Sequence, residues 1–440
     1  MEQAYLNCTL RYPIWMKLPN GLRPFGPDIH YVRLLKTLYG LRQGANSWYE
    51  EQRQYMLGYD KRFLQSDIEP CVYFIIEWPF VFIVWMQTDD YVIATNDDAY
   101  RADFVAAWHK QYGVQDNGAV REVLQASITV TKQYVDIGQQ RLIEDMARRY
   151  GIAEGTKKFT PMSEKLDLLK PVHHKADVPL SSLVMAIFWI ARVSRPDVLS
   201  AASYLSQFCS CCDDTHWTAA LRVLRYLLNT KRDVLRLRPT IPGPDVHIEQ
   251  YSDASYARYA VDRRSYSGSL TFVNGALVDY GSHKQTTTAT APNIAEYDAL
   301  CDAGKDALHA KHWFESLLTY ATARDGHQLP RIITPIPIFG DNTGAAKMSE
   351  QRINNRAFRH VEIRVHAIRD WIERQWVRTA RVAGRRNPAD AMTKPLSRED
   401  FAWFRERIGM FTPPNAYLDD SKTRSEADAK RLENVPLKER

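Results

Sequence analysis

The order of strands and helices between residues 246 and 396 constrains the fold of this chain more than any other feature. VHIEQYSDA (246–254) and SGSLTFV (267–273) have the composition of strands, and Asn274-Gly275 is a strong two-residue hairpin turn before the return strand ALVDYGS. A long helix from about Pro292 to Leu318 follows, and strands and helices then alternate. Three antiparallel strands followed by this alternation predict a mixed sheet flanked by helices.

Four acidic residues lie at the boundaries of these elements. Asp253 is on the first strand and Glu296 in the first turn of the long helix, while Asp341 ends the fourth strand and Asp390 begins a last helix. Because strand ends and helix starts can converge on one face of a sheet, we expect these carboxylates to cluster. Two magnesium ions held side by side need such a set of hard oxygen ligands. Any one acid is unremarkable among 52 Asp and Glu residues, so the argument depends on all four.

Length and composition place the chain among multi-domain globular proteins. Its 440 residues predict two or three domains, and a net charge of +6 is compatible with a polyanionic partner but indicates one only weakly. The six cysteines lack zinc-ligand spacing, which favours a reduced protein. The most apolar stretch, 72–94, is interrupted by charged residues and Pro79, so it is not expected to span a membrane, and we expect no signal peptide. We expect an intracellular protein, cytoplasmic or nuclear, without a membrane partner.

The first segment, 1–115, has an α+β pattern. VYFIIE, FVFIVWMQ and YVIAT are short apolar runs typical of buried strands. Asp89 and Asp90 lie at the turn between the second and third runs. This pair is either a polar hairpin tip or a pair of metal ligands.

The second segment, 116–245, is mainly helical. QQRLIEDMARRYG is amphipathic, SSLVMAIFWIARVSRP is apolar nearly all round, and THWTAALRVLRYLLNTKR begins at a plausible cap, Asp214 or Thr215. Arg222 and Arg225 fall on one side of that last helix, where they either grip a phosphate backbone or form an ordinary solvated face. The chain ends in a charged segment, 397–440, expected to be partly disordered.

Several ordered motifs resemble those of copia-type retrotransposon Pol polyproteins. LLKTLYGLRQGANSWYE is similar to a reverse transcriptase segment of that family, and SDASYA, HKQTT, AEYDAL, GDNTGA, RHVEIRVHAI and ADAMTKPL are similar to motifs of its ribonuclease H. The resemblance runs from about residue 4 to 396. It implies a multi-domain α+β and α/β protein, in which a polymerase palm–thumb fragment precedes a ribonuclease H-like mixed sheet flanked by helices. The expected domains are a truncated palm (1–115), a thumb and connection (116–245), a ribonuclease H-like domain (246–396) and the tail (397–440).

The nuclease part of the resemblance implies a function for the four acids. Asp253, Glu296, Asp341 and Asp390 match the family's catalytic carboxylates, which implies hydrolysis of the RNA strand of an RNA–DNA hybrid by two Mg²⁺ ions, with Mn²⁺ as an alternative. One ion would activate the attacking water and the other would stabilise the leaving ribose oxygen. His360 either assists proton transfer or product release, or packs beside a helix start.

The polymerase part of the resemblance is incomplete. The family places one catalytic Asp a few residues before QAYLN, ahead of Met1, and a pair in a Tyr-x-Asp-Asp turn, where this chain has Gln87-Thr88-Asp89-Asp90. The resemblance also implies that the fingers lie outside these 440 residues. Asp89 and Asp90 are therefore expected to be a remnant polymerase metal site, with little or no polymerase activity from this chain alone. Gln43, in the LYGLRQ motif, is expected to contact nucleic acid.

One departure from the family lies close to the acids. Arg258 stands where relatives often have glycine, near enough to Asp253 in sequence to disturb metal binding or to help a phosphate bind. Three hypotheses follow. The first is a hybrid-cleaving ribonuclease attached to a polymerase remnant, and the second is a non-catalytic transposon relic that at most binds nucleic acid. The third is a working reverse transcriptase, which would need the missing Asp from another chain or from sequence upstream of Met1. The sequence does not identify protein partners.

Overall fold

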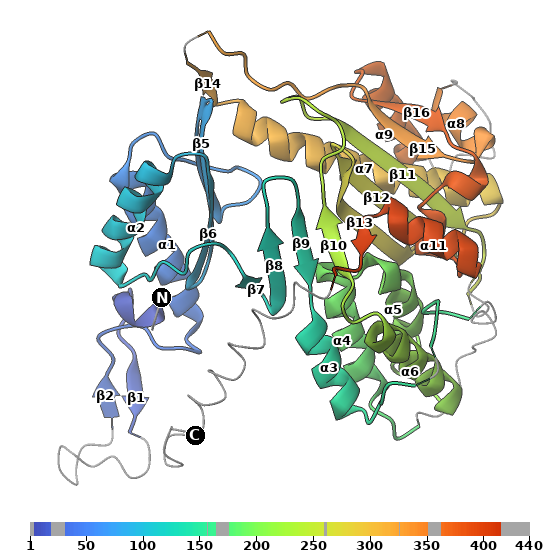
Figure 1. Ribbon diagram of the computed structural model, residues 1–440, viewed down its shortest axis with the longest axis horizontal. Coiled ribbons are helices and arrows are strands. Elements are labelled where there is room, and N and C mark those ends of the chain that lie inside the picture. Colours follow the sequence, from blue (N-terminus) through green and yellow to red (C-terminus); the bar gives the residue numbers. More distant parts are fainter. Residues whose placement is uncertain are drawn as a thin grey trace. The chain divides into compact units, whose positions relative to one another are not determined.

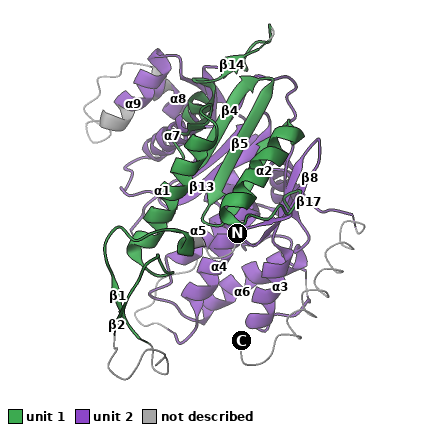
Figure 2. Cartoon of the chain, turned by 90° about the vertical axis from the view of Figure 1, so that its left-hand side faces the viewer, with its two compact units in different colours: residues 1–120, 310–332 green, residues 121–309, 333–440 purple. Residues whose placement is uncertain are grey.

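The computed structural model describes residues 4–18, 31–155, 157–163, 176–258, 262–324, 326–350 and 362–414. The chain forms two compact units (Figure 2): unit 1 contains residues 1–120 and 310–332, and unit 2 contains residues 121–309 and 333–440. The first division lies near the expected one at 115, whereas none falls at 245. Within the described ranges, no helix is both long and apolar enough to cross a membrane.

Unit 1 is built around an antiparallel sheet that contains the three expected strands. β4 (Val72–Trp78), β5 (Phe80–Gln87) and β6 (Asp90–Thr95) are neighbours in that order, with β3 (Leu64–Gln65) and β14 (Thr322–Ala323) beside β4. Helices α1 (Arg42–Tyr59) and α2 (Asp98–Tyr112) lie on one side of this sheet (Figure 1). A short 3-10 helix, η1 (Ala4–Asn7), and the hairpin of β1 (Trp15–Lys17) and β2 (Tyr31–Arg33) complete the unit.

Strand alternation divides the apolar side chains of β4 between two faces. Tyr73 and Ile75 join the cluster that holds Trp48 of α1 and Phe104 of α2. Phe74 and Ile76 point to the other face, where they pack against residues 313–321. Both faces of this strand are therefore covered within unit 1.

The larger sheet of unit 2 has the predicted strand arrangement. β11 (Ile248–Ser255), β12 (Tyr266–Val273) and β13 (Ala276–Lys284) are antiparallel, and β15 (Ile336–Gly340) and β16 (Val377–Arg381) continue the sheet in parallel beside β11. Asn274 and Gly275 have positive φ, as their hairpin turn requires. Helices α7 (Pro292–Leu318), α8 (Thr343–Glu350), α9 (Glu362–Glu373) and α10 (Asp390–Thr393) and the 3-10 turn η5 (Gly384–Arg386) connect or follow these strands. The mixed α/β architecture is confirmed.

Unit 2 also contains a second sheet that the sequence did not reveal. Its order is β17-β10-β9-β8-β7, formed by β7 (Glu122–Val123), β8 (Ala126–Val130), β9 (Val135–Gly138), β10 (Val234–Leu237) and β17 (Met410–Phe411). These strands are two to five residues long, too short for a periodic pattern to be distinctive.

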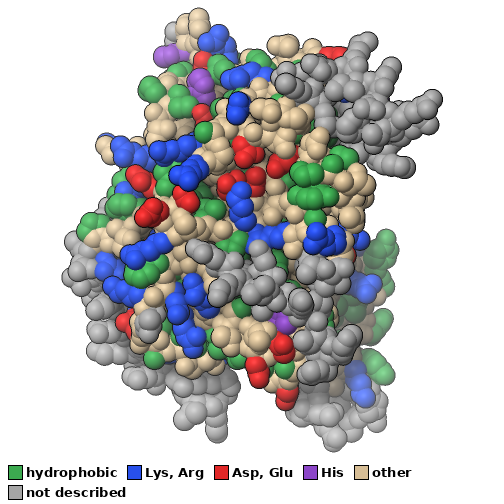
Figure 3. All heavy atoms as spheres, turned by 90° about the vertical axis from the view of Figure 1, so that its right-hand side faces the viewer, with side chains coloured by type: hydrophobic (Ala, Val, Ile, Leu, Met, Phe, Trp, Pro, Cys, Tyr) green, Lys and Arg blue, Asp and Glu red, His purple; other side chains and the backbone are tan. Residues whose placement is uncertain are grey.

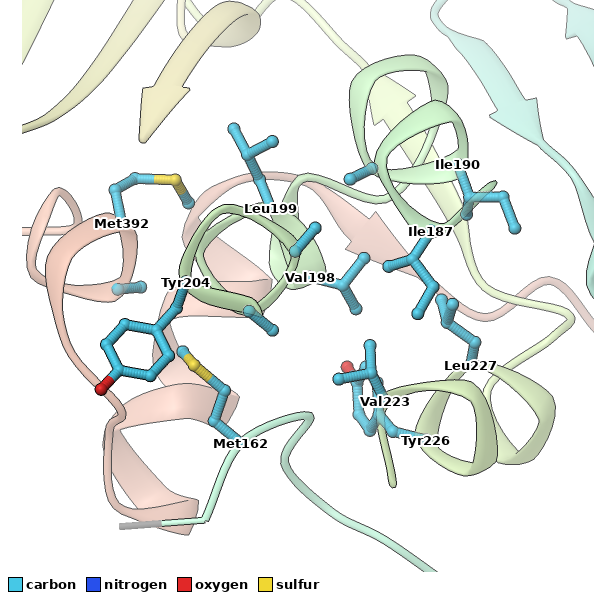
Figure 4. Close-up of a cluster of buried hydrophobic side chains, with 14 of the residues drawn as sticks. Met162, Ile187, Ile190, Val198, Leu199, Tyr204, Val223, Tyr226, Leu227 and Met392 are labelled. Atoms are coloured by element: carbon cyan, nitrogen blue, oxygen red, sulfur yellow. The ribbon is translucent and has the colours of Figure 1, made fainter. Parts of the chain in front are cut away.

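A helical layer belongs to the same unit. It comprises α3 (Gln140–Arg149), α4 (Leu180–Val193), η3 (Pro196–Val198), α5 (Leu199–Ser206) and α6 (Asp214–Asn229). Figure 4 shows Ile187, Leu199 and Val223 from three of these elements and Met392 of α10, which all belong to one buried cluster. The cap of α6 is Asp213 rather than the expected Asp214 or Thr215, because the Asp213 carboxylate accepts from the backbone N–H groups of Thr215 and His216.

The expected tail begins too early. Residues 398–407 form α11 (Arg398–Arg407), and Phe401 and Phe404 are buried in the main cluster of unit 2. The charged residues that suggested disorder lie on the outer side of this helix or form ion pairs, while two aromatic side chains anchor it. Residues 415–440 lie outside the described part of the chain.

A fully buried ion pair holds the helical layer together. The Arg195 side chain donates to both carboxylate oxygens of Asp197, at 2.9 and 2.8 Å, and to the carbonyl of Thr230 at 3.0 Å. The Tyr226 hydroxyl also donates to Asp197, and Arg405 of α11 lies 3.5 Å from it. Burial alone would raise the pKa of Asp197, but the Arg195 guanidinium holds it below its usual value.

Replacing Asp197 by alanine will leave the Arg195 guanidinium buried without its carboxylate. We expect the free energy of unfolding to fall by about 3–5 kcal/mol, the usual result of breaking a buried pair. Urea unfolding of the full chain, followed by circular dichroism, measures this loss. Asp145→Ala is the matched control, because it removes an exposed ion pair with Arg148 and should cost less than about 1 kcal/mol. Equal losses in the two variants would contradict the prediction.

Candidate metal centre

The four acids come from four different elements of unit 2. Asp253 lies near the end of β11 and is 2% exposed, and Glu296 is in the second turn of α7. Asp341 follows the last residue of β15 directly, and Asp390 is the first residue of α10. Because β11 and β15 are parallel neighbours, their carboxyl ends reach the same edge of the sheet. The sheet order therefore places Asp253 beside Asp341.

Three of these acids meet at one point. Asp253, Glu296 and Asp341 each offer a carboxylate oxygen, and the three oxygens lie within 4.8 Å of one another. Asp390 is close enough to Asp253 for each acid to shift the pKa of the other. The sequence-predicted set thus lies in one cluster, with Asp390 at its side.

Backbone and side-chain contacts hold the cluster in place. The backbone N–H of Ala254 donates to Glu296 Oε2 at 3.2 Å, which joins β11 to α7. The buried Asn387 amide donates to the carbonyl of Ser252 at 2.9 Å, which joins β11 to the segment before α10. The Thr393 hydroxyl donates to Asp253 Oδ2. Each contact involves one of the four acids or a residue close to one of them in the chain.

A glycine allows α10 to approach the sheet. A β-carbon built on Gly268 of β12 would lie 2.6 Å from Met392 Cβ and 2.9 Å from the carbonyl oxygen of Ala389. Any side chain at this position would therefore push away the short helix that begins at Asp390. On the other side, Met392 packs in the buried cluster of the helical layer (Figure 4).

Burial raises the pKa values of three of the four carboxyl groups, those of Asp253, Glu296 and Asp390. Burial, together with the charges of Asp253 and Asp341, raises the pKa of Glu296 to about 9. Burial and the charge of Asp253 raise the pKa of Asp390 to about 7. Asp253, the most buried, also has a raised pKa, chiefly from burial. Negative charge at this site therefore needs a compensating cation.

Lys394 supplies part of that compensation. Its ammonium lies 2.9 Å from Asp390 Oδ2, one helical turn away. Burial alone would lower the pKa of Lys394, but the charges of Asp253 and Asp390 raise it. Sequence reasoning gave this lysine no role, although the spacing of four from Asp390 was a usable signal.

The donor set fits a hard divalent cation. All of its ligands would be carboxylate oxygens, the atoms that Mg²⁺ and Mn²⁺ favour. In addition, Asp390 Oδ1 is buried and accepts no hydrogen bond from any described residue. A buried carboxylate oxygen of this kind is costly unless a donor or a metal ion meets it. The cluster could therefore hold metal ions, and its chemistry favours oxygen-seeking ones.

Arg258 braces the site instead of entering it. Its Nη1 donates to the carbonyl of Thr393, and its guanidinium lies 5.6 Å from the ring centre of Tyr204. The residue thus connects the segment after β11 to the end of α10 and to α5.

The remaining expected site residues lie apart from this cluster. Asp89 and Asp90 are at the β5–β6 turn of unit 1, where Trp48 and Gln52 donate to the carbonyl of Thr88. Within the described ranges, Asp253, Glu296 and Asp341 of unit 2 form the group of potential metal ligands whose atoms lie close enough together to hold one ion. Asp89 and Asp90 have no third described acid within such reach.

The residues expected to contact nucleic acid differ in burial and in the hydrogen bonds that their side chains form within the protein. Arg222 donates to Thr160 and to the carbonyl of Met162, and with Arg225 it lines a cavity next to that segment. Gln43 is half-buried on α1, and its Oε1 accepts no hydrogen bond from described residues. His360 lies outside the described residues.

Gly268→Ala will displace α10 because the added methyl group collides with Met392. We expect a loss of about 1–3 kcal/mol in stability, the usual effect of overpacking, together with weaker binding of Mg²⁺. Thermal unfolding with and without Mg²⁺ measures both. Gly340→Ala on β15 is the control, since its methyl group would meet only Ser252, at 3.9 Å. A Gly268→Ala protein as stable and as responsive to Mg²⁺ as this control would contradict the expectation.

The stability of the metal-free chain will decrease as pH rises from about 5 to about 9. Glu296 has a pKa of about 9 when folded and about 4.5 when unfolded, so in this window the folded chain binds more protons. Melting temperatures in EDTA across this range test the slope. Glu296→Gln should flatten it, and saturating Mg²⁺ should raise stability most at high pH, where the ligands ionise. An identical slope in the wild type and Glu296→Gln would refute this origin.

Comparisons with known proteins bear on both halves of the chain. A family model described as reverse transcriptase (RNA-dependent DNA polymerase) matches residues 1–164. The retrovirus-related Pol polyprotein from transposon TNT 1-94 of Nicotiana tabacum is 26% identical over 422 residues, 93% of this chain. This chain spans only 30% of the length of that relative. Secreted RxLR effector protein 161 of Plasmopara viticola is 42% identical over 132 residues, 30% of this chain and 91% of that protein.

Solved structures give a weaker likeness. The crystal structure of RNase H1 from Halobacterium salinarum is 18% identical and covers 33% of this chain and 94% of that one, with a TM-score of 0.23. A score this low adds nothing to the fold assignment, which rests on the sheet order above.

Proposed function

We propose that this chain, which belongs to the copia-type retrotransposon Pol polyproteins, cleaves the RNA strand of RNA–DNA hybrids at the carboxylate cluster of unit 2. The observation that supports this proposal best is the meeting of Asp253, Glu296 and Asp341 within 4.8 Å, with Asp390 beside them. Four carboxylates from four elements have no structural benefit that offsets their mutual repulsion. A metal-dependent reaction would explain why the fold nevertheless brings these four carboxylates together.

The cluster has the composition needed for phosphodiester hydrolysis. Asp253, Glu296 and Asp341 would hold one Mg²⁺, and Asp390 with Asp253 would contribute to a second. Bound ions of this kind lower the pKa of a water and neutralise charge on phosphate oxygens. The chain itself orients the ligands, through Ala254 at Glu296 and Thr393 at Asp253. Ligands held in advance reduce the rearrangement needed on metal binding.

The choice of an RNA strand requires recognition of the 2′-hydroxyl, because that group alone distinguishes RNA from DNA along the backbone. The proposal of a hybrid substrate rests on family membership and on the carboxylate cluster together. The Asp89–Asp90 pair of unit 1 does not support a second reaction in the same way, because the described residues bring no third acid to it.

Asp341→Asn will abolish cleavage. We expect purified full-length chain to cut a labelled RNA–DNA hybrid in Mg²⁺ and to leave the DNA strand intact. Asp341→Asn should lower the rate by roughly 100-fold or more, because a ligand of the metal site is worth several kcal/mol of barrier. Asp370→Asn is the matched control, since Asp370 is exposed on α9 and pairs with Arg374. Gel electrophoresis of both labelled strands measures the rates.

Failure of a folded chain to cut the hybrid in Mg²⁺ or Mn²⁺ would overturn the proposed function. Retained binding of the hybrid in that case would favour a non-catalytic nucleic-acid-binding protein. Cleavage that persists in Asp341→Asn would instead place the reaction elsewhere.

A further inference from the structure

Three arginines lie close together in the segment between β16 and α10. Arg381 is the last residue of β16, and Arg385 and Arg386 belong to η5. All three are exposed. We call them the arginine ridge. Three exposed cations within six residues form a concentrated positive charge on one short segment.

The ridge lies beside the carboxylate cluster. Arg381 is the register partner of Gly340, the residue before Asp341, and the backbone N–H of Val382 donates to the Gly340 carbonyl at 3.0 Å. A β-carbon built on Gly384 would lie 3.2 Å from Asp341 Oδ2. The backbone of the ridge therefore passes directly next to one of the expected metal ligands.

The side chains of the ridge have few partners among the residues that the structure describes. Arg381 and Arg385 form no ion pair or side-chain hydrogen bond with any residue that the structure describes. Arg386 lies over the ring of Trp403, 5.5 Å from its centre, a contact that leaves its donors free. The cation that pairs with Asp390 is Lys394, 2.9 Å from its Oδ2, and no described arginine of the ridge forms such a pair.

Figure 3 shows acidic side chains gathered on one face of the molecule, with Lys and Arg side chains next to them. A strand cleaved at the acidic cluster would bring its neighbouring phosphates to nearby cations. Guanidinium groups bind phosphate with two parallel hydrogen bonds, which also fixes the orientation of the strand.

We infer that Arg381, Arg385 and Arg386 bind the phosphodiester backbone of the nucleic acid next to the bond that is cleaved. This inference rests on the proposed function and deepens it, because it assigns the binding of neighbouring phosphates to a specific segment. These interactions fix the position of the strand and are independent of base sequence.

Binding at several salt concentrations tests the ridge. The full chain with Asp341→Asn, which prevents cutting, is titrated against a fluorescent RNA–DNA hybrid in Mg²⁺. Adding Arg381→Ala, Arg385→Ala and Arg386→Ala should weaken binding about tenfold or more at moderate salt. It should also reduce the slope of log K against log salt by about one unit for each phosphate that the variant no longer binds.

A second triple variant serves as the control. Lys132→Ala, Arg141→Ala and Arg149→Ala remove the same charge from exposed positions on the β8–β9 turn and α3, elements that hold none of the four acids. We expect this control to change the slope by less than about one unit. Melting temperatures of both variants, compared with the parent, verify folding.

The outcomes separate the two proposals. Equal effects of the two triple variants, or an unchanged slope in the ridge variant, would overturn the role of the ridge while leaving the nuclease intact. Absence of hybrid binding by the parent chain would overturn both. Tight binding of the parent with a slope that falls only in the ridge variant would support the ridge even if cleavage were not detected.

Discussion

The buried ion pair of Arg195 and Asp197 connects the helical layer of unit 2 to the C-terminal helix α11. Arg195 lies between α4 and η3, and Asp197 belongs to η3. Tyr226 of α6 donates to Asp197, and Arg405 of α11 lies 3.5 Å from it. Residues separated by about two hundred positions therefore share one charge network, and each is buried at a high cost unless the others are present. This network connects the helical layer with the C-terminal helix, and these two elements flank the sheet of β11, β12, β13, β15 and β16 in the sequence. Helix α11, and α10 through Met392, therefore both pack against the same helical layer.

The carboxylate cluster imposes the opposite kind of constraint, because its charges repel. The raised pKa values of Glu296 and Asp390 show that the fold holds these acids together at a cost. Lys394 offsets part of this repulsion, and Asp390 Oδ1 still has no hydrogen-bond partner among the described residues. An arrangement that is unfavourable for folding but suited to cations is the pattern expected of a functional site.

Several features of the fold and of the candidate site followed from local sequence. The Asn274-Gly275 turn, the apolar strand runs and the long helix beginning at Pro292 have short-range chemical causes, and the structure contains each of them. The early boundary of the tail was wrong because Phe401 and Phe404 are too few to signal a buried face among charged neighbours. The short strands of the second sheet were missed because pairing between β10 and β17 joins residues far apart in the sequence.

The sequence by itself indicated which acids would lie together, because their order and flanking motifs matched a strand and helix pattern whose ends converge. Only the tertiary structure decided what surrounds them: Lys394 beside Asp390, Gly268 beneath Met392, and the arginine ridge against Asp341. These relations depend on distances between segments that are not neighbours along the chain. Periodicity and turn chemistry act over a few residues, whereas close approach and burial are properties of the packed fold.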